Sequence, residues 1–315
     1  MSAVINKPIV NVAVAVVQRS DGRVLLAERP REKVSGGFWE FPGGKFNAGE
    51  SAENALAREL NEEVGIILDK ARPWLSYEYS YPDKFVHLHF FRITAWHGTP
   101  HGREGQRISW EDPAAVNVAP LLPANDKILQ ALKLPAVYGI TNTKKYGVSG
   151  FLTHLGHGLN RGVRLIQVRE TSLSPEQLSQ FALRIIAQAR VYGARVLLNS
   201  EETLARRVGA DGVHSSAKQL MRLTTRPNTG LWAASCHHIE ELSRAAKLGA
   251  DFVVLSQVLP TTSHPGELGI GWQRFAEWIN AYPLPVYALG GMKLDLLDAA
   301  INHGAHGIAL RDGVW

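Results

Sequence analysis

The stretch from residue 43 to residue 66 reads GGKFNAGESAENALARELNEEVGI. Three of its carboxylates, Glu59, Glu62 and Glu63, stand at i, i+3 and i+4. In a helix this spacing places all three on one face of one turn. Like charges at that spacing repel each other, so the arrangement costs stability unless a cation is present. The stretch therefore predicts a helix that bears a cluster of carboxylates on one face, and a function of this cluster would explain its cost in stability.

The helix itself is indicated by apolar residues that recur at helical spacing within the stretch. Ser51 is of a type that caps helix starts, and Gly65 is of a type that ends helices in a left-handed conformation. The apolar stripe between them consists of Ala52, Ala55, Leu56, Leu60 and Val64.

A divalent cation explains the three carboxylates best. Oxygen-only ligands suit a hard ion, and Mg²⁺ in proteins keeps several waters and bridges substrate phosphates. Gly43 and Gly44 allow the backbone to approach such an ion, and Arg58 can pair with a carboxylate and hold it in place. A solvated acidic helix face is the alternative, but it does not explain the glycine pair or the loop residue Glu50.

The fixed distances within the stretch match the Nudix box, so the first part of the chain resembles the Nudix family. The matching residues are Gly44, Glu50, Arg58-Glu59-Leu60, Glu62-Glu63 and Gly65-Ile66. A motif that fixes this many positions rarely arises by chance. The resemblance implies an α/β/α sandwich and hydrolysis of a phosphoanhydride.

From about Val10 to Leu132 the chain is similar to the MutT type of this family. The matching pieces are Trp39-Glu40-Phe41-Pro42-Gly43-Gly44-Lys45, Tyr81-Pro82-Asp83, Arg103-Glu104-Gly105-Gln106 and Pro123-Ala124-Asn125. The resemblance implies an enzyme that converts oxidised guanine nucleoside triphosphates such as 8-oxo-dGTP to the monophosphate and pyrophosphate.

The resemblance also implies roles for single residues. Asn125 would read the modified guanine edge, because an amide both donates and accepts hydrogen bonds; the alternative role is a helix cap, and the two roles do not exclude each other. Phe41 would line the base pocket and Arg29 would contact the nucleotide. Lys84 stands where the family can carry arginine, which keeps the charge but loses the planar fork.

The catalytic ions would be Mg²⁺, with Mn²⁺ as the alternative. The expected ligands are Glu59, Glu62, Glu63, a backbone carbonyl of Gly43, and Glu104 from a later loop. One of Glu59, Glu62 and Glu104 would orient or deprotonate the attacking water, with Arg58 holding the carboxylates.

The chain is too long for one ordinary core, and we expect domains at residues 1–134 and 135–315. In the second part a glycine-alanine motif repeats between helix-like and apolar segments, which indicates a (β/α)8 barrel. The expected strands start at Val137, Arg164, Arg195, Gly212, Leu231, Phe252, Val286 and Gly307. The chain stops soon after the eighth strand, so we expect the last helix to be missing.

From about Ala136 to Trp315 the chain resembles the thiamine-phosphate synthase and TenI family. The matching pieces are Leu165-Ile166-Gln167-Val168-Arg169, Leu198-Asn199, Gly212-Val213-His214, Ser235-Cys236-His237, Pro260-Thr261-Thr262 and Ala288-Leu289-Gly290-Gly291. Barrel ligands bind at the C-terminal ends of strands. The expected ligand site contains Gln167, Arg169, Asn199, His237, Gly290, Gly291 and Arg311, for a phosphorylated thiazole or pyrimidine.

Departures from the family pattern argue against synthase activity. Where the family carries acidic or lysine residues, this chain has Ser200, Ser215-Ser216-Ala217-Lys218, Thr171 and His264. A pyrophosphate leaving group depends on such charge neutralisation. His237 suits proton transfer on a thiazole, as in TenI, although it also stands where it could cap a helix opening at His238.

Composition sets the remaining expectations. The net charge of +5 is mild and does not indicate a duplex-binding surface. Cys236 is the only cysteine, and the sequence shows neither an export signal nor an apolar run long enough to span a membrane, so we expect a cytoplasmic protein. Two alternatives to a nucleotide hydrolase stay open: a Nudix hydrolase of thiamine-type pyrophosphates, and a barrel that only binds its ligand and tunes the first domain.

Overall fold

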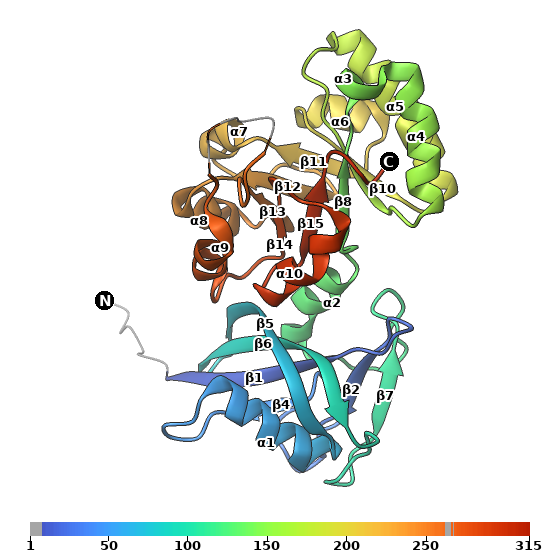
Figure 1. Ribbon diagram of the computed structural model, residues 1–315. Coiled ribbons are helices and arrows are strands. Elements are labelled where there is room, and N and C mark those ends of the chain that lie inside the picture. The colour runs from blue at the N-terminus through green and yellow to red at the C-terminus, as the bar shows by residue number, and fades with distance from the viewer. Residues whose placement is uncertain (1–7, 262–265, 267) are drawn as a thin grey trace. The chain divides into compact units, whose positions relative to one another are not determined.

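The computed structural model describes residues 8–261, 266 and 268–315. It divides into two compact units (Figure 1): the first extends to Lys133 and includes Asn280–Pro283, and the second comprises Leu134–Ile279 and Leu284–Trp315. Thr262 and His264, which the sequence analysis singled out, lie outside the described residues. In the described part of the chain, no helix is both long enough and apolar enough to cross a bilayer.

The first unit is built on two sheets. The first sheet contains, in order, β4 (Gly43–Lys45), β1 (Ile9–Val17), β6 (Phe85–His97) and β5 (Ile67–Ser80). The second contains β3 (Trp39–Glu40), β2 (Val24–Glu28) and β7 (Ile108–Glu111). β1 is parallel to β6 and antiparallel to β4, so the first sheet is mixed.

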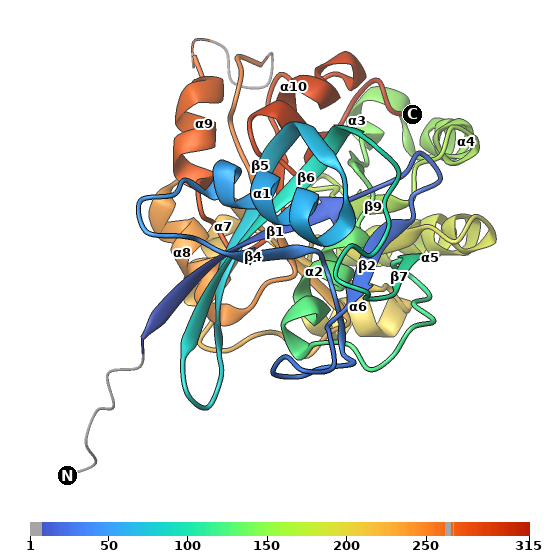
Figure 2. The ribbon, with the colours of Figure 1, turned by 90° about the horizontal axis from the view of Figure 1, so that it is seen from below.

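Alternate residues of β1 enter different cores, which places helices on both faces of the sheet. Ala13 and Ala15 pack with the apolar stripe of α1 (Ala52–Val64), which lies across the first sheet in Figure 2. Val14 and Val16 pack with residues of α2 (Asp126–Leu132), which follows the short helix η1 (Pro123–Asn125). The predicted α/β/α sandwich is confirmed.

The caps of α1 are those that the sequence predicts. The Ser51 hydroxyl accepts a hydrogen bond from the Asn54 N–H at 3.3 Å. Gly65 ends the helix at φ 68°, in the left-handed region. The expected helix and its expected carboxylate face therefore exist, and the helix is fixed against the sheet by its apolar stripe.

The strand β5 is the longest of the elements of the first unit that sequence reasoning missed. Its pairing with β6 shifts register at three places, between Leu68 and Lys70, between Lys70 and Ala71, and between Pro73 and Leu75. Each shift breaks the alternation of apolar and polar residues by which a strand is recognised.

The second unit is a closed barrel of eight parallel strands, as the sequence predicts. The strands are β8 (Val137–Ile140), β9 (Leu165–Val168), β10 (Arg195–Leu198), β11 (Gly212–Ser215), β12 (Leu231–Cys236), β13 (Phe252–Leu255), β14 (Val286–Ala288) and β15 (Gly307–Leu310). Only β9 departs from the predicted starts, by one residue.

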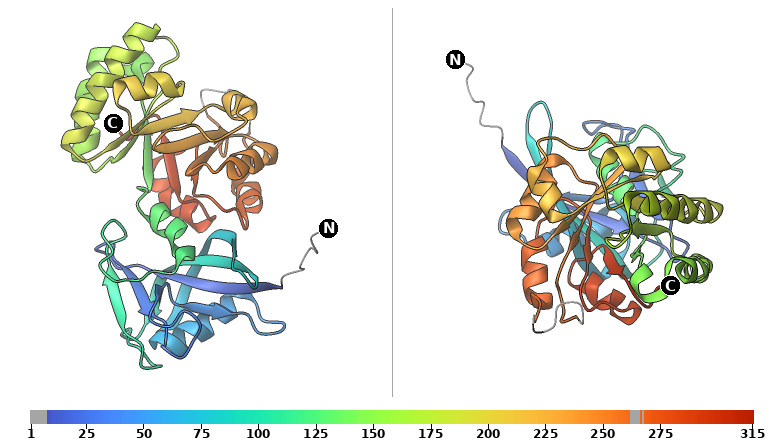
Figure 3. Two further views of the ribbon diagram at one scale, coloured as in Figure 1. Left: turned by 180° about the vertical axis from the view of Figure 1, so that it is seen from behind. Right: turned by 90° about the horizontal axis from the view of Figure 1, so that it is seen from above.

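Helices cover the outside of the barrel (Figure 3). They are α3 (Thr143–Tyr146), α4 (Val148–Asn160), α5 (Pro175–Val191), α6 (Glu202–Val208), α7 (Ala217–Arg222), α8 (Ile239–Leu248), α9 (Gly271–Ile279), η2 (Leu294–Leu296) and α10 (Leu297–Asn302).

The repeated glycine-alanine-aspartate motif holds neighbouring strands together. The Asp211 carboxylate accepts a hydrogen bond from the Val196 N–H at 2.7 Å, and Asp251 accepts one from the Trp232 N–H at 2.7 Å. The glycine of the first copy, Gly209, ends its helix at φ 70°. The motif thus serves the fold, and its aspartates are structural.

Residues 311–315, which follow β15, contain no helix. Instead the Trp315 side chain packs outside β8 and against α4. Its Nε1 donates to the Ile140 carbonyl at 2.9 Å. Gly139 and Gly158 make room for it, since a Cβ on either would lie 2.6 or 2.9 Å from the indole.

Candidate active site

Arg58 is the centre of the carboxylate face of α1. Its guanidinium donates to Glu50 through two hydrogen bonds of 3.0 and 2.8 Å. It also donates to Glu59 at 2.7 Å and to Glu62 at 3.2 Å. The two hydrogen bonds from Arg58 to Glu50, with one from the Asn47 N–H, lower the pKa of Glu50 to about 2. Arg58 therefore fixes three carboxylates of the Nudix box relative to one another.

The two glycines upstream of α1 have different functions. Gly43 has φ 152°, and a Cβ there would lie 2.1 Å from the backbone oxygen of Ala13, so this glycine is required by strand packing. A Cβ on Gly44 would instead lie 2.0 Å from the carboxyl carbon of Glu59. Gly44 thus leaves the space that the Glu59 carboxylate occupies.

Glu63 carries its charge in an unfavourable environment. Burial, and then the charges of Glu40 and Glu59, raise its pKa to about 8. The Gly43 N–H, which donates to Glu63 Oε2 at 3.1 Å, opposes the shift. A nearby cation would relieve this cost. The expected use of the Gly43 carbonyl as a ligand stays a prediction.

Glu104 lies on a loop that is tied to the end of α1. The Gln106 side chain donates to the Glu63 carbonyl at 2.8 Å and accepts from the Glu104 N–H at 2.8 Å. The Glu104 carboxylate pairs with Lys33 Nζ at 2.7 Å. This partner was not predicted, because it lies on a loop that the sequence motifs did not include.

The expected ligands supply the kind of donor atom that a divalent ion takes, but their side chains are not gathered around one point. In the described residues, no three acidic, histidine or cysteine side chains converge as a ready metal site. Three of the four expected acidic ligands pair with the chain's own cations, Glu59 and Glu62 with Arg58 and Glu104 with Lys33. All donors are oxygens, which suits an ion that keeps part of its water shell.

Asn125 is buried, with 5% of its surface exposed. Its Nδ2 donates to the Trp39 carbonyl at 3.2 Å, and its side chain makes no capping bond to α2. The side-chain capping alternative is therefore wrong, although Asn125 occupies the N-cap position of α2. Since an amide has two N–H donors and an acceptor oxygen, the Trp39 bond uses only one of these groups.

The three other residues expected to contact the nucleotide differ in their burial and in the partners of their side chains. Phe41 is 2% exposed and belongs to the core on the α2 side. Arg29 pairs with Glu40 and donates from Nε to the Val34 carbonyl at 2.9 Å. Lys84 Nζ lies 3.9 Å from Asp83. Glu40 also lies at this site, and sequence reasoning did not single it out. Burial raises the pKa of Glu40, and its pairing with Arg29 opposes this shift.

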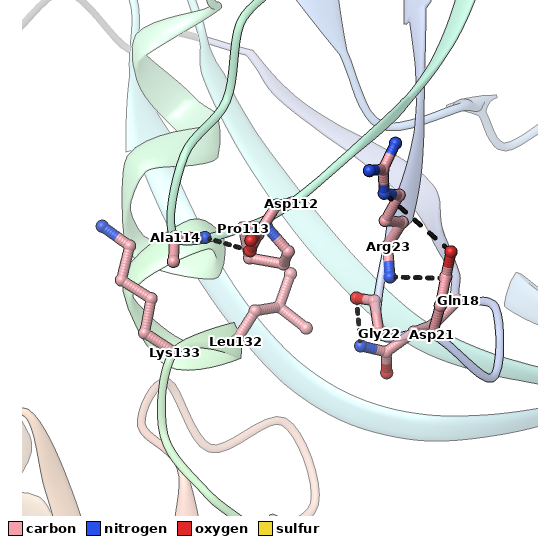
Figure 4. Close-up of a pocket in the computed structure, with 9 residues that line it drawn as sticks. All are labelled: Gln18, Asp21, Gly22, Arg23, Asp112, Pro113, Ala114, Leu132 and Lys133. Carbon is pink, nitrogen blue, oxygen red and sulfur yellow. Dashed lines mark hydrogen bonds and ion pairs between the residues drawn. The ribbon is translucent and has the colours of Figure 1, made fainter. Parts of the chain in front are cut away.

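A pocket of about 490 Å³ in the first unit lies away from these residues (Figure 4). It is lined by Gln18, Asp21, Gly22, Arg23, Asp112, Pro113, Ala114, Leu132 and Lys133. Its two aspartates accept hydrogen bonds from backbone N–H groups of their own turns, at 3.1 Å from Arg23 and 2.8 Å from Ala114. No expected site residue lines it, so we do not assign the nucleotide to it.

In the second unit the expected ligand residues lie in the C-terminal half of a strand or just after a strand. Because the strands are parallel, these residues lie at one end of the barrel: Gln167 and Arg169 (β9), Asn199 (β10), His237 (β12), Gly290 and Gly291 (β14) and Arg311 (β15). In the described part of the chain, neither Gln167 Nε2 nor Arg311 Nε has a hydrogen-bond acceptor. Burial, and then the charge of Arg311, lower the pKa of Arg169. This end of the barrel therefore favours an anion.

His237 is held by Glu241 and does not cap α8. Glu241 accepts a hydrogen bond from the His237 N–H, and its carboxylate lies 3.2 Å from His237 Nδ1. His238 occupies the N-cap position and makes no side-chain capping bond. The capping alternative for this histidine is also wrong.

Sequence reasoning missed a buried polar chain inside the barrel. The ring nitrogens of His214 lie 3.1 Å from the Tyr138 hydroxyl and 2.8 Å from the Ser235 hydroxyl. Burial lowers the pKa of His214 to about 3, so the ring is neutral. The alternation of inward-facing residues in the strands was the signal that could have revealed it.

The fold and the carboxylate site define the first unit as a hydrolase that acts on diphosphate bonds, a class that generally uses a divalent metal ion. The NUDIX domain model matches residues 7–132, and the model described as thiamine monophosphate synthase matches residues 137–314. The chain belongs to the Nudix family through its first unit and to the thiamine monophosphate synthase family through its second.

Similar proteins match one unit or the other. An 8-oxo-dGTP diphosphatase of Haemophilus influenzae is 36% identical over 40% of this chain and 93% of that protein. A CTP pyrophosphohydrolase of Escherichia coli is 37% identical over 39% of this chain and 90% of that protein. A thiamine-phosphate synthase of Thioalkalivibrio sulfidiphilus is 29% identical over 58% of this chain and 89% of that protein.

Proposed function

We propose that the first unit hydrolyses oxidised guanine nucleoside triphosphates, foremost 8-oxo-dGTP, to the monophosphate and pyrophosphate. The observation that carries the proposal is the Arg58 network, which fixes Glu50, Glu59 and Glu62 beside the glycine pair. Removal of such nucleotides from the pool prevents mutagenic misincorporation during DNA replication.

The ligands of the ion would be Glu59, Glu62, Glu63, Glu104 and the Gly43 carbonyl, with Mg²⁺ the first choice and Mn²⁺ the second. When bound, such an ion neutralises phosphate charge and makes water a stronger nucleophile at neutral pH. The chain's own carboxylates then orient the water and accept its proton, as its oxygen attacks phosphorus and the bond to the pyrophosphate oxygen breaks. The accepting group is one of Glu59, Glu62 and Glu104, and Arg58 positions the first two.

Recognition of the base would fall to Asn125. Its position, buried and bonded to the Trp39 carbonyl, fixes the amide while leaving one N–H and the oxygen for the guanine edge. Phe41 supports this region from the core, Arg29 would contact the nucleotide, and Lys84 would contribute positive charge.

A substrate panel tests the proposal: 8-oxo-dGTP, dGTP, CTP and thiamine diphosphate with Mg²⁺, compared by kcat/KM. CTP belongs in the panel because the relatives named for 8-oxo-dGTP and for CTP are 36% and 37% identical to this chain. Highest kcat/KM for 8-oxo-dGTP supports the proposal. A preference for CTP would reject the base assignment, and a preference for thiamine diphosphate would favour the metabolic alternative.

For the barrel we propose binding of a phosphorylated thiazole or pyrimidine without synthase activity. The unpartnered Gln167 and Arg311 nitrogens, with Arg169 at the same end, supply donors and positive charge for a phosphorylated ring. Ser200 and Thr171 leave few charged groups for a pyrophosphate. Calorimetry of the full chain with thiazole phosphate checks this, and a tautomerase assay on His237→Ala checks the alternative of proton transfer.

A further inference from the structure

The loop between β2 and β3 carries a lysine on a well-defined backbone. The Gly37 N–H donates to the Arg29 carbonyl at 2.9 Å, and the Gly36 N–H donates to the Lys33 carbonyl at 2.9 Å. Arg29 Nε fastens the loop from inside by donating to the Val34 carbonyl. Ser35 has φ 60°, a conformation that non-glycine residues adopt at a cost. The loop is thus closed on itself, with Lys33 at its tip.

Lys33 faces the carboxylates that we assign to the metal site. Its Nζ lies 2.7 Å from Glu104 Oε2. Its charge also acts on Glu63 and on Glu40, lowering the pKa of both. One ammonium group therefore pairs with Glu104 and acts on carboxylates from two further segments of the first unit.

The pair between Lys33 and Glu104 is easily exchanged. The two side chains are 46% and 40% exposed, and exposed ion pairs contribute little to stability. The two nearby arginines are more restricted. Arg58 bonds three carboxylates, and Arg29 bonds Glu40 and a backbone carbonyl. Lys33 is the cation that can leave its partner at least cost.

We propose that Lys33 is a substrate-contacting residue that exchanges Glu104 for a phosphate oxygen when the divalent ion and the nucleotide bind. This deepens the proposed function and rests on it. Glu104 is released to the ion, and the ammonium group, a compact charge on a flexible stem, follows the negative charge to the phosphates. The loop of residues 29–37 thereby links ion binding to substrate binding.

The first experiment measures Mn²⁺ binding to the full chain without nucleotide, by electron paramagnetic resonance. Lys33→Met should bind Mn²⁺ about 3-fold or more tightly than the wild type, because Glu104 loses its competing partner. In a Glu104→Gln background the same change should have no effect, which isolates the pair. Arg31→Met is the matched control, because it removes the same charge from the same loop and Arg31 acts on Glu28 instead.

The second experiment measures phosphate contact. With saturating Mn²⁺, Lys33→Met should weaken binding of inorganic tripolyphosphate and lower kcat/KM for the nucleotide by about 10- to 100-fold, as for a lost charged hydrogen bond. Lys33→Arg should restore most of both, and Arg31→Met should change neither.

Unchanged Mn²⁺ affinity in Lys33→Met would overturn the proposal, and so would unchanged tripolyphosphate affinity. The proposed function and the proposed role of Lys33 can each be rejected independently of the other. If the wild type hydrolyses no nucleotide of the panel, the proposed function fails, while the Mn²⁺ and tripolyphosphate measurements still decide the role of Lys33.

Discussion

In both units burial disfavours the charged form of a titratable group, but the two groups differ in the partners that surround them. In the first unit burial raises the pKa of Glu63 to about 8, and two further carboxylates act on it. In the barrel burial lowers the pKa of His214 to about 3, and hydroxyl groups of Tyr138 and Ser235 meet both ring nitrogens. The charge of Lys33 acts on Glu63 but leaves its pKa raised, whereas both ring nitrogens of His214 have partners within the protein. The comparison indicates that the carboxylate site of the first unit is completed by a ligand, and that the polar chain around His214 is complete without one.

The largest expected effect comes from removing the charge of Glu63. Glu63→Gln should lower kcat about 10³-fold or more, the scale seen when charge stabilisation of a transition state is lost. Circular dichroism should show the fold retained, since the neutral amide avoids the cost of burying a charge. Glu53→Gln, on the exposed first turn of α1, is the control. Near-normal turnover of Glu63→Gln would remove the contrast between the units.

The second-largest effect tests whether the Asn125 side chain has hydrogen-bonding groups left for the base of the nucleotide. Asn125→Ala should lower kcat/KM for 8-oxo-dGTP by about 10- to 100-fold, the cost of one or two hydrogen bonds, and lower that for CTP less. The exposed Asn117→Ala serves as control. Equal losses on all nucleotides would show that Asn125 acts on the fold alone.

The barrel should be sensitive to acid through His214. Its folded pKa lies below the unfolded value near 6.5, so below that pH the unfolded chain binds a proton that the folded barrel does not. The free energy of unfolding should therefore fall as pH drops from about 6.5 towards 3, by at most about 1.4 kcal/mol per pH unit.

Hydrogen exchange of peptides from β11 and β12 measures this slope in the full chain. His214→Gln should flatten it while lowering stability at neutral pH, because the amide replaces the ring imperfectly. A slope that survives in His214→Gln would assign the acid response to other groups.

The smallest effect concerns the ion-free first unit, whose pH response has the opposite sign. The folded pKa of Glu63 is above its unfolded value, so stability is present below about pH 4.5 and is lost as pH rises towards 8. Mg²⁺ at ten times its Kd should restore about 1.4 kcal/mol. Hydrogen exchange of α1 peptides should slow with Mg²⁺ at pH 8 and stay unchanged in Glu63→Gln, while β11 peptides should not respond.

Local patterns predicted the parts of the fold that depend on neighbouring residues. The caps at Ser51 and Gly65 and the strand starts of the barrel follow from short-range chemistry that a sequence displays directly. The strand β5 was missed because its register shifts hide the alternation. For the site, the spacing of Glu59 and Glu63 on one helix was sufficient to place both carboxylates.

Contacts between distant segments could not be predicted in the same way. Lys33 and Glu104 are 71 residues apart in the chain, and Tyr138 and His214 are 76 residues apart. Nothing in either local sequence signals the other, and only the folded loops and the closed barrel bring them together. The alternative roles of Asn125 and His237 as caps failed because neither side chain bonds a backbone N–H of the helix that follows it. The Asn125 side chain bonds the Trp39 carbonyl, and His237 pairs with the Glu241 side chain in the first turn of α8.

Gly44 has a practical consequence for work in living cells. Its backbone is outside the left-handed region, and the nearest obstacle to a methyl group is the movable end of Glu59. Gly44→Ala would therefore displace one carboxylate while leaving every ionisable residue, the net charge and the barrel sequence untouched. Such an allele would separate the functions of the two units genetically, so that any function it leaves intact could be attributed to the barrel.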